Sequence, residues 1–287
     1  MDLRTGLGVA GKGTALITGA SSGLGAEFAR QLARRGYDLV LVARRRERLE
    51  ELIEELLTTC KIAAEALVAD LSQEADLRRV EERIASLQNL ALLINNAGFG
   101  LRGRFHKSQI EEQLEMIQVH VIASVRLCRA ALPVMISRGA GAIINVASMA
   151  ALIPTASVTY SATKAYLVAF SRSLQIELEG SGVQVQALCP GFTMTEFHDA
   201  PRSSRMERTL IPGWLWLRPE TVVRASLRGL ERGETVCIPG MIYKLAAWLI
   251  AEPLTAPLVR LIVRHIYLRR KSEKAIKDRT ESKSDNK

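Results

Sequence analysis

Short runs of consecutive apolar residues alternate along this chain with longer segments whose apolar residues recur at helical spacing. The runs at Asp38–Ala43 and Ala142–Ala147 are almost wholly apolar, which is typical of strands in a parallel sheet covered on both faces. The expected strands are Thr14–Thr18, Asp38–Ala43, Ile62–Val68, Ala91–Asn95, Gly141–Ala147, Val183–Cys189 and Glu234–Ile238. The expected helices are Gly23–Arg35, Arg45–Thr58, Asp76–Ser86, Gln109–Ser137, Tyr160–Ser181 and Pro219–Arg232. Because each strand precedes a helix, the pattern predicts an α/β fold with a doubly wound parallel sheet.

Two segments break this alternation. Residues 192–218 contain two prolines and two tryptophans and are too long for an ordinary connection, so we expect a substrate lid there. Met241–Leu268 is strongly apolar but is interrupted by charges and two prolines. No uninterrupted span in it approaches the roughly 20 apolar residues that a transmembrane helix needs. We therefore divide the chain into a main domain, residues 1–240, and an apolar and basic extension, residues 241–287.

The composition allows a large core. The chain has 287 residues, of which 48% are hydrophobic, and its four cysteines are too scattered for a disulfide framework or a metal site. We therefore expect no metal. The start, Met1-Asp-Leu-Arg-Thr, lacks the apolar run of a secretory signal, which predicts a cytoplasmic location.

The positive charge is concentrated at the end of the chain. The net charge is +9, and residues 264–287 hold nine Lys and Arg against four Asp and Glu. The remaining body is nearly neutral, which argues against nucleic-acid binding. The basic tail is either solvated or lies at a membrane surface.

A glycine-rich turn follows the first expected strand and opens the first expected helix, with the spacing TGxxxGxG. Main-chain N–H groups at a helix start favour a phosphate, although glycine also serves tight packing of a strand against a helix. The placement favours a nucleotide-binding turn. Its candidate residues are Gly19, Ser21, Ser22, Gly23, Leu24 and Gly25.

Three arginines follow the second expected strand, where an acidic residue would bind a free ribose 2′-hydroxyl. Guanidinium groups suit a 2′-phosphate instead. The alternative is a solvated helix start, because these arginines mix with Glu47 and Glu50. We expect NADP(H) as cofactor, with Arg44 as the main contact and Arg45 as the alternate.

Tyr160 and Lys164 lie four residues apart in an expected helix and so share one face. An ammonium beside a phenol lowers the phenol pKa from its ordinary value of about 10. Such a tyrosine can act as a general acid or base.

Four blocks now occur in order: TGASSGLG at 18–25, NNAG at 95–98, YSATK at 160–164 and CPGFTMT at 189–195. Together they resemble the short-chain dehydrogenase/reductase family from about Gly11 to Pro239. The resemblance implies a Rossmann-type fold in which Tyr160 is the acid/base, Lys164 lowers its pKa and holds the nicotinamide ribose, and Ser148 polarises the substrate oxygen. It also implies further cofactor contacts, at Asp70, Leu71, Asn96, Ala97, Gly98, Pro190, Gly191 and Thr193.

The chain departs from the family pattern at two places. His120 stands where the family usually has an asparagine that helps to hold a proton-relay water, partly through its main-chain carbonyl. We consider it either a relay member or a buried structural histidine. The step from Ser148 to Tyr160 is also about one residue shorter than is common in the family, so we expect an adjustment at the pocket mouth, in residues 154–157.

The segments expected to face the substrate are rich in apolar side chains. They include Phe99, Leu101, Phe105, Met149, Ile153, Phe192, Met194, Phe197, Ile211, Trp214 and Leu215. We expect a lipophilic carbonyl or alcohol as substrate, such as an oxoacyl compound or a steroid-like or other hydrophobic ketone or aldehyde. The alternative is a catalytically weak sensor or scaffold that retains the cofactor site.

Two kinds of contact are also expected outside the site. The resemblance implies a homo-oligomer that pairs Gln109–Ser137 and Tyr160–Ser181 across a symmetric interface. Met241–Leu268 either lies on a membrane surface or folds back over the lid or a second copy. The side chains that would fold back are Tyr243, Leu245, Trp248, Leu249 and Leu258.

Overall fold

The computed structural model describes residues 13–101, 103–153, 155, 157–198 and 211–252. Within them, seven parallel strands form one sheet in the order β3-β2-β1-β4-β5-β6-β7. The strands are β1 (Thr14–Thr18), β2 (Asp38–Ala43), β3 (Ala64–Val68), β4 (Leu90–Asn95), β5 (Gly141–Val146), β6 (Val183–Leu188) and β7 (Val236–Cys237). The order reverses between β1 and β4, and ligands of such sheets bind beyond the carboxyl ends of the strands at this point.

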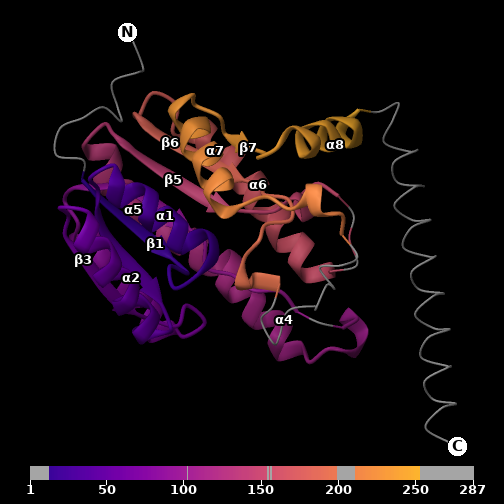
Figure 1. Cartoon of the computed structure of the whole chain (residues 1–287), viewed down its shortest axis with the longest axis horizontal. Coiled ribbons are helices and arrows are strands. Elements are labelled where there is room, and N and C mark those ends of the chain that lie inside the picture. Colours follow the sequence, from indigo (N-terminus) through magenta and orange to yellow (C-terminus); the bar gives the residue numbers. More distant parts are fainter. Residues whose placement is uncertain (1–12, 102, 154, 156, 199–210, 253–287) are drawn as a thin grey trace, which may run out of the picture.

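Helices cover both faces of the sheet (Figure 1). One face carries α1 (Gly23–Arg34), α2 (Arg46–Thr59) and α7 (Pro219–Glu231), and the other carries α3 (Glu74–Ser86), α5 (Ala123–Ser137) and α6 (Val158–Glu177). Helix α4 (Ile110–Ile117) leads into α5 through a π-helical turn, Gln118–Ile122. The predicted α/β fold with a doubly wound parallel sheet is confirmed.

A separate hydrophobic core lies on each face of the sheet, and neighbouring residues of one strand pack into different cores. Ile17 packs in the cluster with α1, α2 and α7, whereas Leu16 packs in the cluster with α3, α5 and α6, and both are fully buried. Successive side chains of a strand point to opposite faces. Strands covered on both faces therefore need the continuous apolar runs seen in the sequence.

The ends of several elements differ from the sequence-based expectation. Helix α6 begins at Val158 and ends at Glu177, whereas the sequence pattern predicted a helix from Tyr160 to Ser181. Gly180 and Gly182 adopt φ values of +82° and +77°, a left-handed conformation that ends a helix. The expected helix Gln109–Ser137 is divided by the π-helical turn.

The apolar segment after Pro239 begins with a helix, α8 (Met241–Ala251), which the sequence pattern did not predict. Tyr243 is buried, and its hydroxyl donates to the carbonyl of Leu215 at 2.6 Å and accepts from the main-chain N–H of Phe192 at 3.1 Å. The buried side chain of Tyr243 therefore attaches α8 to the main domain. Leu258 lies outside the described residues.

One helical run in the described residues, Ile110–Ser137, is long and apolar enough to cross a membrane, and half of its most apolar window is buried in the fold. It packs against β4, β5 and α3. That position is the one expected of a core helix beside the sheet.

Candidate active site

The glycine-rich turn joins the carboxyl end of β1 to α1. Gly19 has a φ of +65°, and a Cβ at this position would lie 2.9 Å from the Cα of Ala97. A Cβ at Gly25 would overlap the carbonyl oxygen of Gly19. Helix α1 begins at Gly23 without a side-chain cap from Ser22, so its first N–H groups face the space beyond the turn. This main-chain cradle fits a cofactor pyrophosphate.

The turn after β4 is hydrogen-bonded to the glycine-rich turn. The Asn96 side chain donates to the carbonyls of Thr18 and Gly19 at 2.9 and 3.1 Å. The Thr18 hydroxyl oxygen accepts from the main-chain N–H groups of Asn96 and Ala97, both at 3.0 Å. The Asn96 side chain thus shapes the turn, and Thr18 is a supporting residue that the sequence analysis did not single out.

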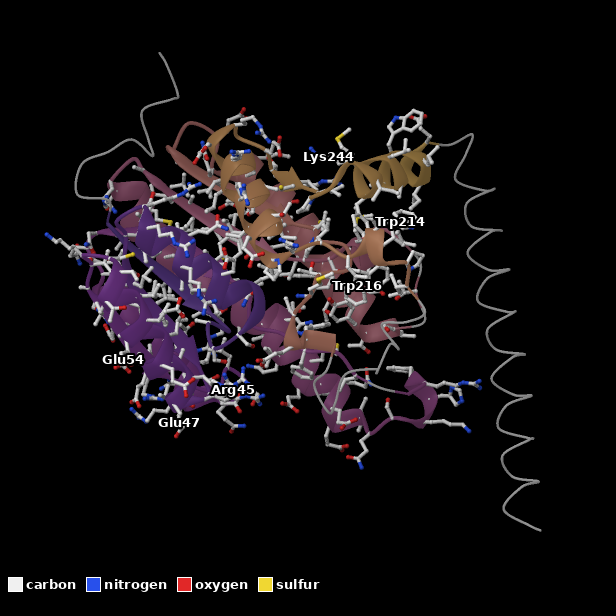
Figure 2. The ribbon with its side chains drawn as sticks, viewed as in Figure 1. Arg45, Glu47, Glu54, Trp214, Trp216 and Lys244 are labelled. Atoms are coloured by element: carbon white, nitrogen blue, oxygen red, sulfur yellow. The ribbon has the colours of Figure 1, made fainter. Side chains whose placement is uncertain are left out.

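The two candidate arginines make different contacts. Arg44 lies 3.6 Å from the Asp70 carboxylate. Arg45, labelled in Figure 2, donates to the Ser21 hydroxyl at 3.1 Å and lies 3.3 Å from the carboxylate of Glu196 in the lid segment. Both arginines follow the end of β2, and of these partners only Ser21, bound by Arg45, belongs to the glycine-rich turn.

Asp70 and Leu71, both predicted to contact the cofactor, also make contacts within the protein. One Asp70 carboxylate oxygen accepts from the main-chain N–H and the hydroxyl of Ser72 at 3.0 and 2.8 Å, so this residue caps local structure in addition to pairing with Arg44. The Leu71 side chain is buried in the core, which leaves only its main chain for a ligand.

Ser148, Tyr160 and Lys164 lie together beyond β5. Ser148 starts a short 3-10 helix, Met149–Ala151, and its hydroxyl accepts from the N–H of Ala150 at 3.1 Å. Tyr160 lies in the first turn of α6. Burial raises the pKa of Tyr160, and a hydrogen bond with Ser148 opposes that rise.

Lys164 is buried, and its ammonium donates to the carbonyl of Val146 at 2.7 Å. It lies 5.8 Å from the centre of the Tyr160 ring. Burial lowers the pKa of Lys164 to about 8. The structure thus brings the three residues together, with the lysine anchored to the sheet.

His120 lies in the π-helical turn next to these residues. Its ring centre is 5.8 Å from that of Tyr160 and 5.6 Å from that of Phe99, with both pairs edge to face. Burial and the ammonium of Lys164 hold the His120 pKa well below its ordinary value. Its main-chain carbonyl accepts a hydrogen bond from the Ser124 hydroxyl at 2.9 Å.

The turn after β6 leads into residues 192–218, the segment expected to be a lid. Pro190 accepts from the N–H of Met149 at 3.0 Å, and the Thr193 hydroxyl donates to the carbonyl of Gly191 at 3.0 Å. A Cβ at Gly191 would overlap the ring of Tyr243. Tyr243 therefore fixes this turn from outside the 1–240 boundary drawn from the sequence. Residues 199–210 of the expected lid lie outside the described residues.

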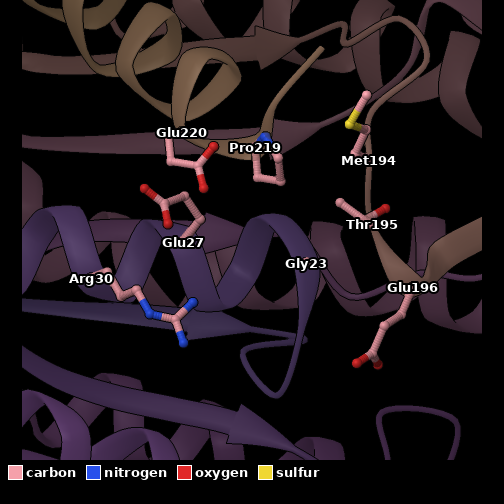
Figure 3. A pocket seen from close by; sticks show the side chains of 8 residues that line it. All are labelled: Gly23, Glu27, Arg30, Met194, Thr195, Glu196, Pro219 and Glu220. Carbon is pink, nitrogen blue, oxygen red and sulfur yellow. The ribbon is translucent and has the colours of Figure 1, made fainter. Parts of the chain in front are cut away.

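A polar cavity of about 320 Å³ lies beside the start of α1. Figure 3 shows Glu27 and Glu220 facing each other at one side of it, and Thr195 and Glu196 near Gly23 at the other. A Cβ at Gly23 would lie 3.2 Å from the Thr195 side chain. The lid segment thus approaches the glycine-rich turn closely.

Two buried asparagines join the central strands near the site. Asn95 donates to the Asn145 side chain at 2.8 Å, and Asn145 donates to the Ser171 hydroxyl at 2.9 Å. Asn95 therefore has a structural role. Among the residues that the structure describes, no cluster of three or more His, Cys, Asp or Glu side chains is placed to hold a metal ion.

Comparisons with known proteins agree with this geometry. A family model described as short chain dehydrogenase matches residues 13–205. The very-long-chain 3-oxoacyl-CoA reductase-B of Danio rerio is 30% identical over 257 residues, which cover 87% of this chain and 78% of that protein.

Solved structures are similar over most of the chain. A short-chain dehydrogenase from Sphingobium yanoikuyae in complex with NADPH is 39% identical, with a TM-score of 0.75, and the match covers 80% of this chain and 88% of that one. A bulky-bulky ketone specific alcohol dehydrogenase from Comamonas testosteroni is 34% identical, with a TM-score of 0.72, over 81% of this chain and 88% of that one.

The chain belongs to the short-chain dehydrogenase family. It is an oxidoreductase with a nicotinamide-binding Rossmann-type fold, and its chemistry interconverts an alcohol and a carbonyl.

Proposed function

We propose that this protein is an NADP(H)-dependent oxidoreductase that interconverts a carbonyl and a secondary alcohol on a lipophilic small molecule. The observation that carries the proposal is that Ser148, Tyr160 and Lys164 lie beyond β5, at the same edge of the sheet as the main-chain cradle that fits a cofactor pyrophosphate. When bound, the nicotinamide supplies or accepts the hydride.

In carbonyl reduction, the Tyr160 hydroxyl gives its proton to the carbonyl oxygen, and in alcohol oxidation the phenolate takes that proton. Ser148 donates a hydrogen bond to the same oxygen and holds it beside the phenol. Because burial raises the pKa of Tyr160, the phenol is protonated at neutral pH, which suits reduction. The Lys164 ammonium helps to hold the nicotinamide ribose.

The preference for NADP(H) is supported by two guanidinium groups at the end of β2. Arg44 and Arg45 are both exposed there; Arg45 binds Ser21 of the glycine-rich turn, and Arg44 lies beside Asp70. When a 2′-phosphate binds, the two guanidinium groups would exchange their present partners, the Asp70 and Glu196 carboxylates, for a more highly charged one. The similar Sphingobium yanoikuyae enzyme was solved with NADPH.

Aromatic rings support a lipophilic substrate. Phe197 of the lid segment lies 5.9 Å from the Tyr160 ring, and Phe192 lies 5.7 Å from Trp216. Apolar walls around few polar groups are typical of sites for apolar ligands. The names of the similar proteins, a very-long-chain 3-oxoacyl-CoA reductase and a bulky-bulky ketone specific alcohol dehydrogenase, favour an oxoacyl or bulky hydrophobic ketone.

The protein is proposed to form a homo-oligomer through the helices beside the site. Large apolar side chains are exposed on α4, on the π-helical turn and α5, and on α6, and apolar surfaces of this kind mark interfaces. They are Ile110, Leu114, Ile117, Ile122, Ile136, Val158, Tyr166 and Ile176. Light scattering of the natural chain and of Leu114→Glu tests this, since a monomeric natural chain would contradict it.

A cytoplasmic location at the membrane surface is proposed from α8 and the basic tail. Met241, Leu245 and Trp248 recur along one side of α8 and are all exposed, and exposed Trp214 lies beside this helix (Figure 2). An exposed apolar stripe followed by basic residues is the pattern of an interfacial helix. Lipid contact would place a lipophilic substrate near the lid.

The activity is tested by NADPH and NADH consumption against aldehydes, ketones and 3-oxoacyl thioesters of graded chain length. Tyr160→Phe should keep NADPH binding within about threefold and lose most turnover, roughly hundredfold or more, because proton transfer contributes that much. Near-normal turnover of Tyr160→Phe would remove the phenol from the reaction.

A further inference from the structure

His120 is held at both ring nitrogens. Nε2 lies 3.0 Å from the main-chain nitrogen of Phe99, and Nδ1 lies 3.0 Å from the Thr163 hydroxyl oxygen. The side chain is 1% exposed. Solvent therefore does not compete for either hydrogen bond.

These partners fix the tautomer. A main-chain N–H can only donate, so Nε2 carries no proton and accepts from Phe99. The Thr163 hydroxyl gives its single proton to the carbonyl of Tyr160, at 2.9 Å, so its oxygen accepts from Nδ1–H. The Phe99 N–H alone requires a neutral imidazole with its proton on Nδ1, and the Thr163 oxygen, which accepts from Nδ1–H, agrees with that tautomer.

The imidazole thereby ties two parts of the site together. Phe99 follows the NNAG block after β4, and Thr163 precedes Lys164 on α6. The charged or titratable groups that face the ring are Lys164, whose charge lowers the His120 pKa further, and the phenol of Tyr160. A second positive charge on the ring would lie against both the ammonium and the Phe99 N–H.

We propose that His120 is a positioning residue, a neutral Nδ1–H imidazole that joins the turn after β4 to α6 and so fixes where Tyr160 and Lys164 lie. It does not carry protons between solvent and Lys164. The catalytic meaning of this inference rests on the proposed function, but the tautomer and the two hydrogen bonds are testable without a substrate.

Gly98 gives the inference a second, independent test. A Cβ added at Gly98 would lie 2.9 Å from Nε2 and 3.2 Å from Cδ2 of His120, and no other residue supplies its three nearest atoms. The glycine is thus required by the imidazole itself. A smaller side chain at position 120 should relieve that requirement.

The first experiment is a nitrogen-15 NMR spectrum of the natural chain with labelled histidine, assigned with His120→Asn. We expect a protonated Nδ1 and an unprotonated Nε2 that do not change between about pH 5 and about pH 8, the range in which histidine ordinarily titrates. Exposed His106 is the internal control. A titrating His120 or an Nε2–H tautomer overturns the inference.

The second experiment measures unfolding free energies of the natural chain, Gly98→Ala, His120→Asn and the double variant. Gly98→Ala should destabilise the natural chain strongly and the His120→Asn chain little, because the obstructing ring is gone. If Gly98→Ala alone does not fold, recovery of folded protein in the double variant is the expected result. An equal loss in both backgrounds overturns the proposed contact.

The third experiment separates positioning from proton relay. His120→Leu removes both hydrogen bonds of the imidazole, whereas Thr163→Val removes the acceptor of Nδ1–H. Each should lower kcat about tenfold or more, with the KM for NADPH within about threefold and the shape of the pH profile unchanged, and Thr163→Ser should recover most of the loss. A lost pH limb in the His120 variants would support a relay and overturn the proposal.

The two proposals fail in different ways. If the natural chain turns over none of the panel, the proposed function is in doubt, while the spectrum and the unfolding cycle still decide the tautomer and the Gly98 contact.

Discussion

Lys164 donates a hydrogen bond to the main-chain carbonyl of Val146, with 2.7 Å between Nζ and the oxygen. Val146 is the last residue of β5 and lies two positions before Ser148. The ammonium is therefore fixed to the same strand end that positions the serine. Burial lowers the pKa of this lysine from its ordinary 10.5 to about 8, so a charged Lys164 at neutral pH costs stability.

Lys164→Met should stabilise the fold near pH 7 and should change how stability depends on pH. Between about pH 8 and pH 10.5 the unfolded chain binds a proton at Lys164 that the folded chain does not, so the stability of the natural chain gains a rising contribution in this window. The lowering from 10.5 to about 8 corresponds to roughly 3 kcal/mol. The advantage of the variant should therefore shrink by up to that amount as the pH rises through the window.

The measurement is chemical denaturation of both proteins across that pH range, with the exposed Lys244→Met as the matched control. Taking the difference between natural chain and variant removes the contributions of other titrating groups. A constant difference from pH 7 to above about pH 10 would show that burial does not perturb Lys164.

Ser148→Ala should move the alkaline limit of carbonyl reduction to higher pH. Reduction needs the protonated phenol of Tyr160, and the hydrogen bond with Ser148 lowers the Tyr160 pKa. Removing it lets the pKa rise, so the loss of activity with increasing pH begins later. The rate itself should fall about a hundredfold to about a thousandfold, because one donor to the reacting oxygen is lost.

The pH profiles of natural chain, Ser148→Ala and Ser148→Thr decide this, since threonine keeps a hydroxyl. The serine also caps the 3-10 helix Met149–Ala151, so folding of each variant must be verified first. A limit that moves to lower pH would mean that Ser148 does not act on the phenol in this way.

The sequence pattern was sufficient for the sheet, and it indicated at which edge of the sheet most candidate site residues lie. Continuous apolar runs identify strands that are buried on both faces, and the glycine-rich and Tyr-Lys blocks depend on residues close together in the chain. In the structure, Gly19 and Ser148 follow the carboxyl ends of β1 and β5, and Tyr160 and Lys164 lie in α6; their roles in the reaction stay predictions.

Contacts between distant segments could not be predicted in this way. The hydrogen bond from Phe99 to His120 joins residues 21 positions apart, and the one from Phe192 to Tyr243 joins residues 51 positions apart. The spacing of apolar and polar residues along the chain does not predict such contacts. The side chains of α8 also differ in their surroundings: Tyr243 folds back onto the lid segment, whereas Leu245 and Trp248 are exposed. The expectation that Tyr243 folds back over the lid segment is therefore met, whereas contact of this segment with a membrane surface stays a prediction.

Arg44→Asp should weaken NADPH binding by about tenfold to about a hundredfold and narrow its advantage over NADH. The change replaces a phosphate partner by a repelling carboxylate and places that carboxylate next to Asp70. Arg48→Asp, on the exposed part of α2, gives the same change of charge away from the turn. Cofactor fluorescence titration measures both dissociation constants.

If the ratio of the dissociation constants for NADPH and NADH is unchanged in Arg44→Asp, Arg44 does not bind the 2′-phosphate and Arg45 is the remaining candidate. Arg45→Ala then becomes the decisive variant. Because Arg45 also bonds Ser21 and lies 3.3 Å from Glu196, its loss should additionally change the position of the lid segment.

Binding to anionic liposomes should depend on the exposed stripe of α8. Met241 is 81% exposed, and Leu245 and Trp248 are each 56% exposed. A lipid surface would bury these side chains, and each Lys or Arg of the basic tail near that surface adds about 1 kcal/mol of attraction. The double variant Leu245→Ser/Trp248→Ser should therefore bind at least about tenfold more weakly.

Co-sedimentation at low and high salt measures this binding, with Leu57→Ser, an equally polar change at an exposed leucine of α2, as the control. A variant that lacks the basic tail should end after Glu252 and not after Pro239. Tyr243 fills the space above Gly191 and accepts a hydrogen bond from Phe192, so a chain that ends at Pro239 would lose a side chain that holds the turn after β6. The truncated chain should keep its fold and lose the salt-sensitive part of binding, since it lacks the tail charges. If the natural chain does not sediment with anionic liposomes even at low salt, the stripe of α8 meets protein instead of lipid.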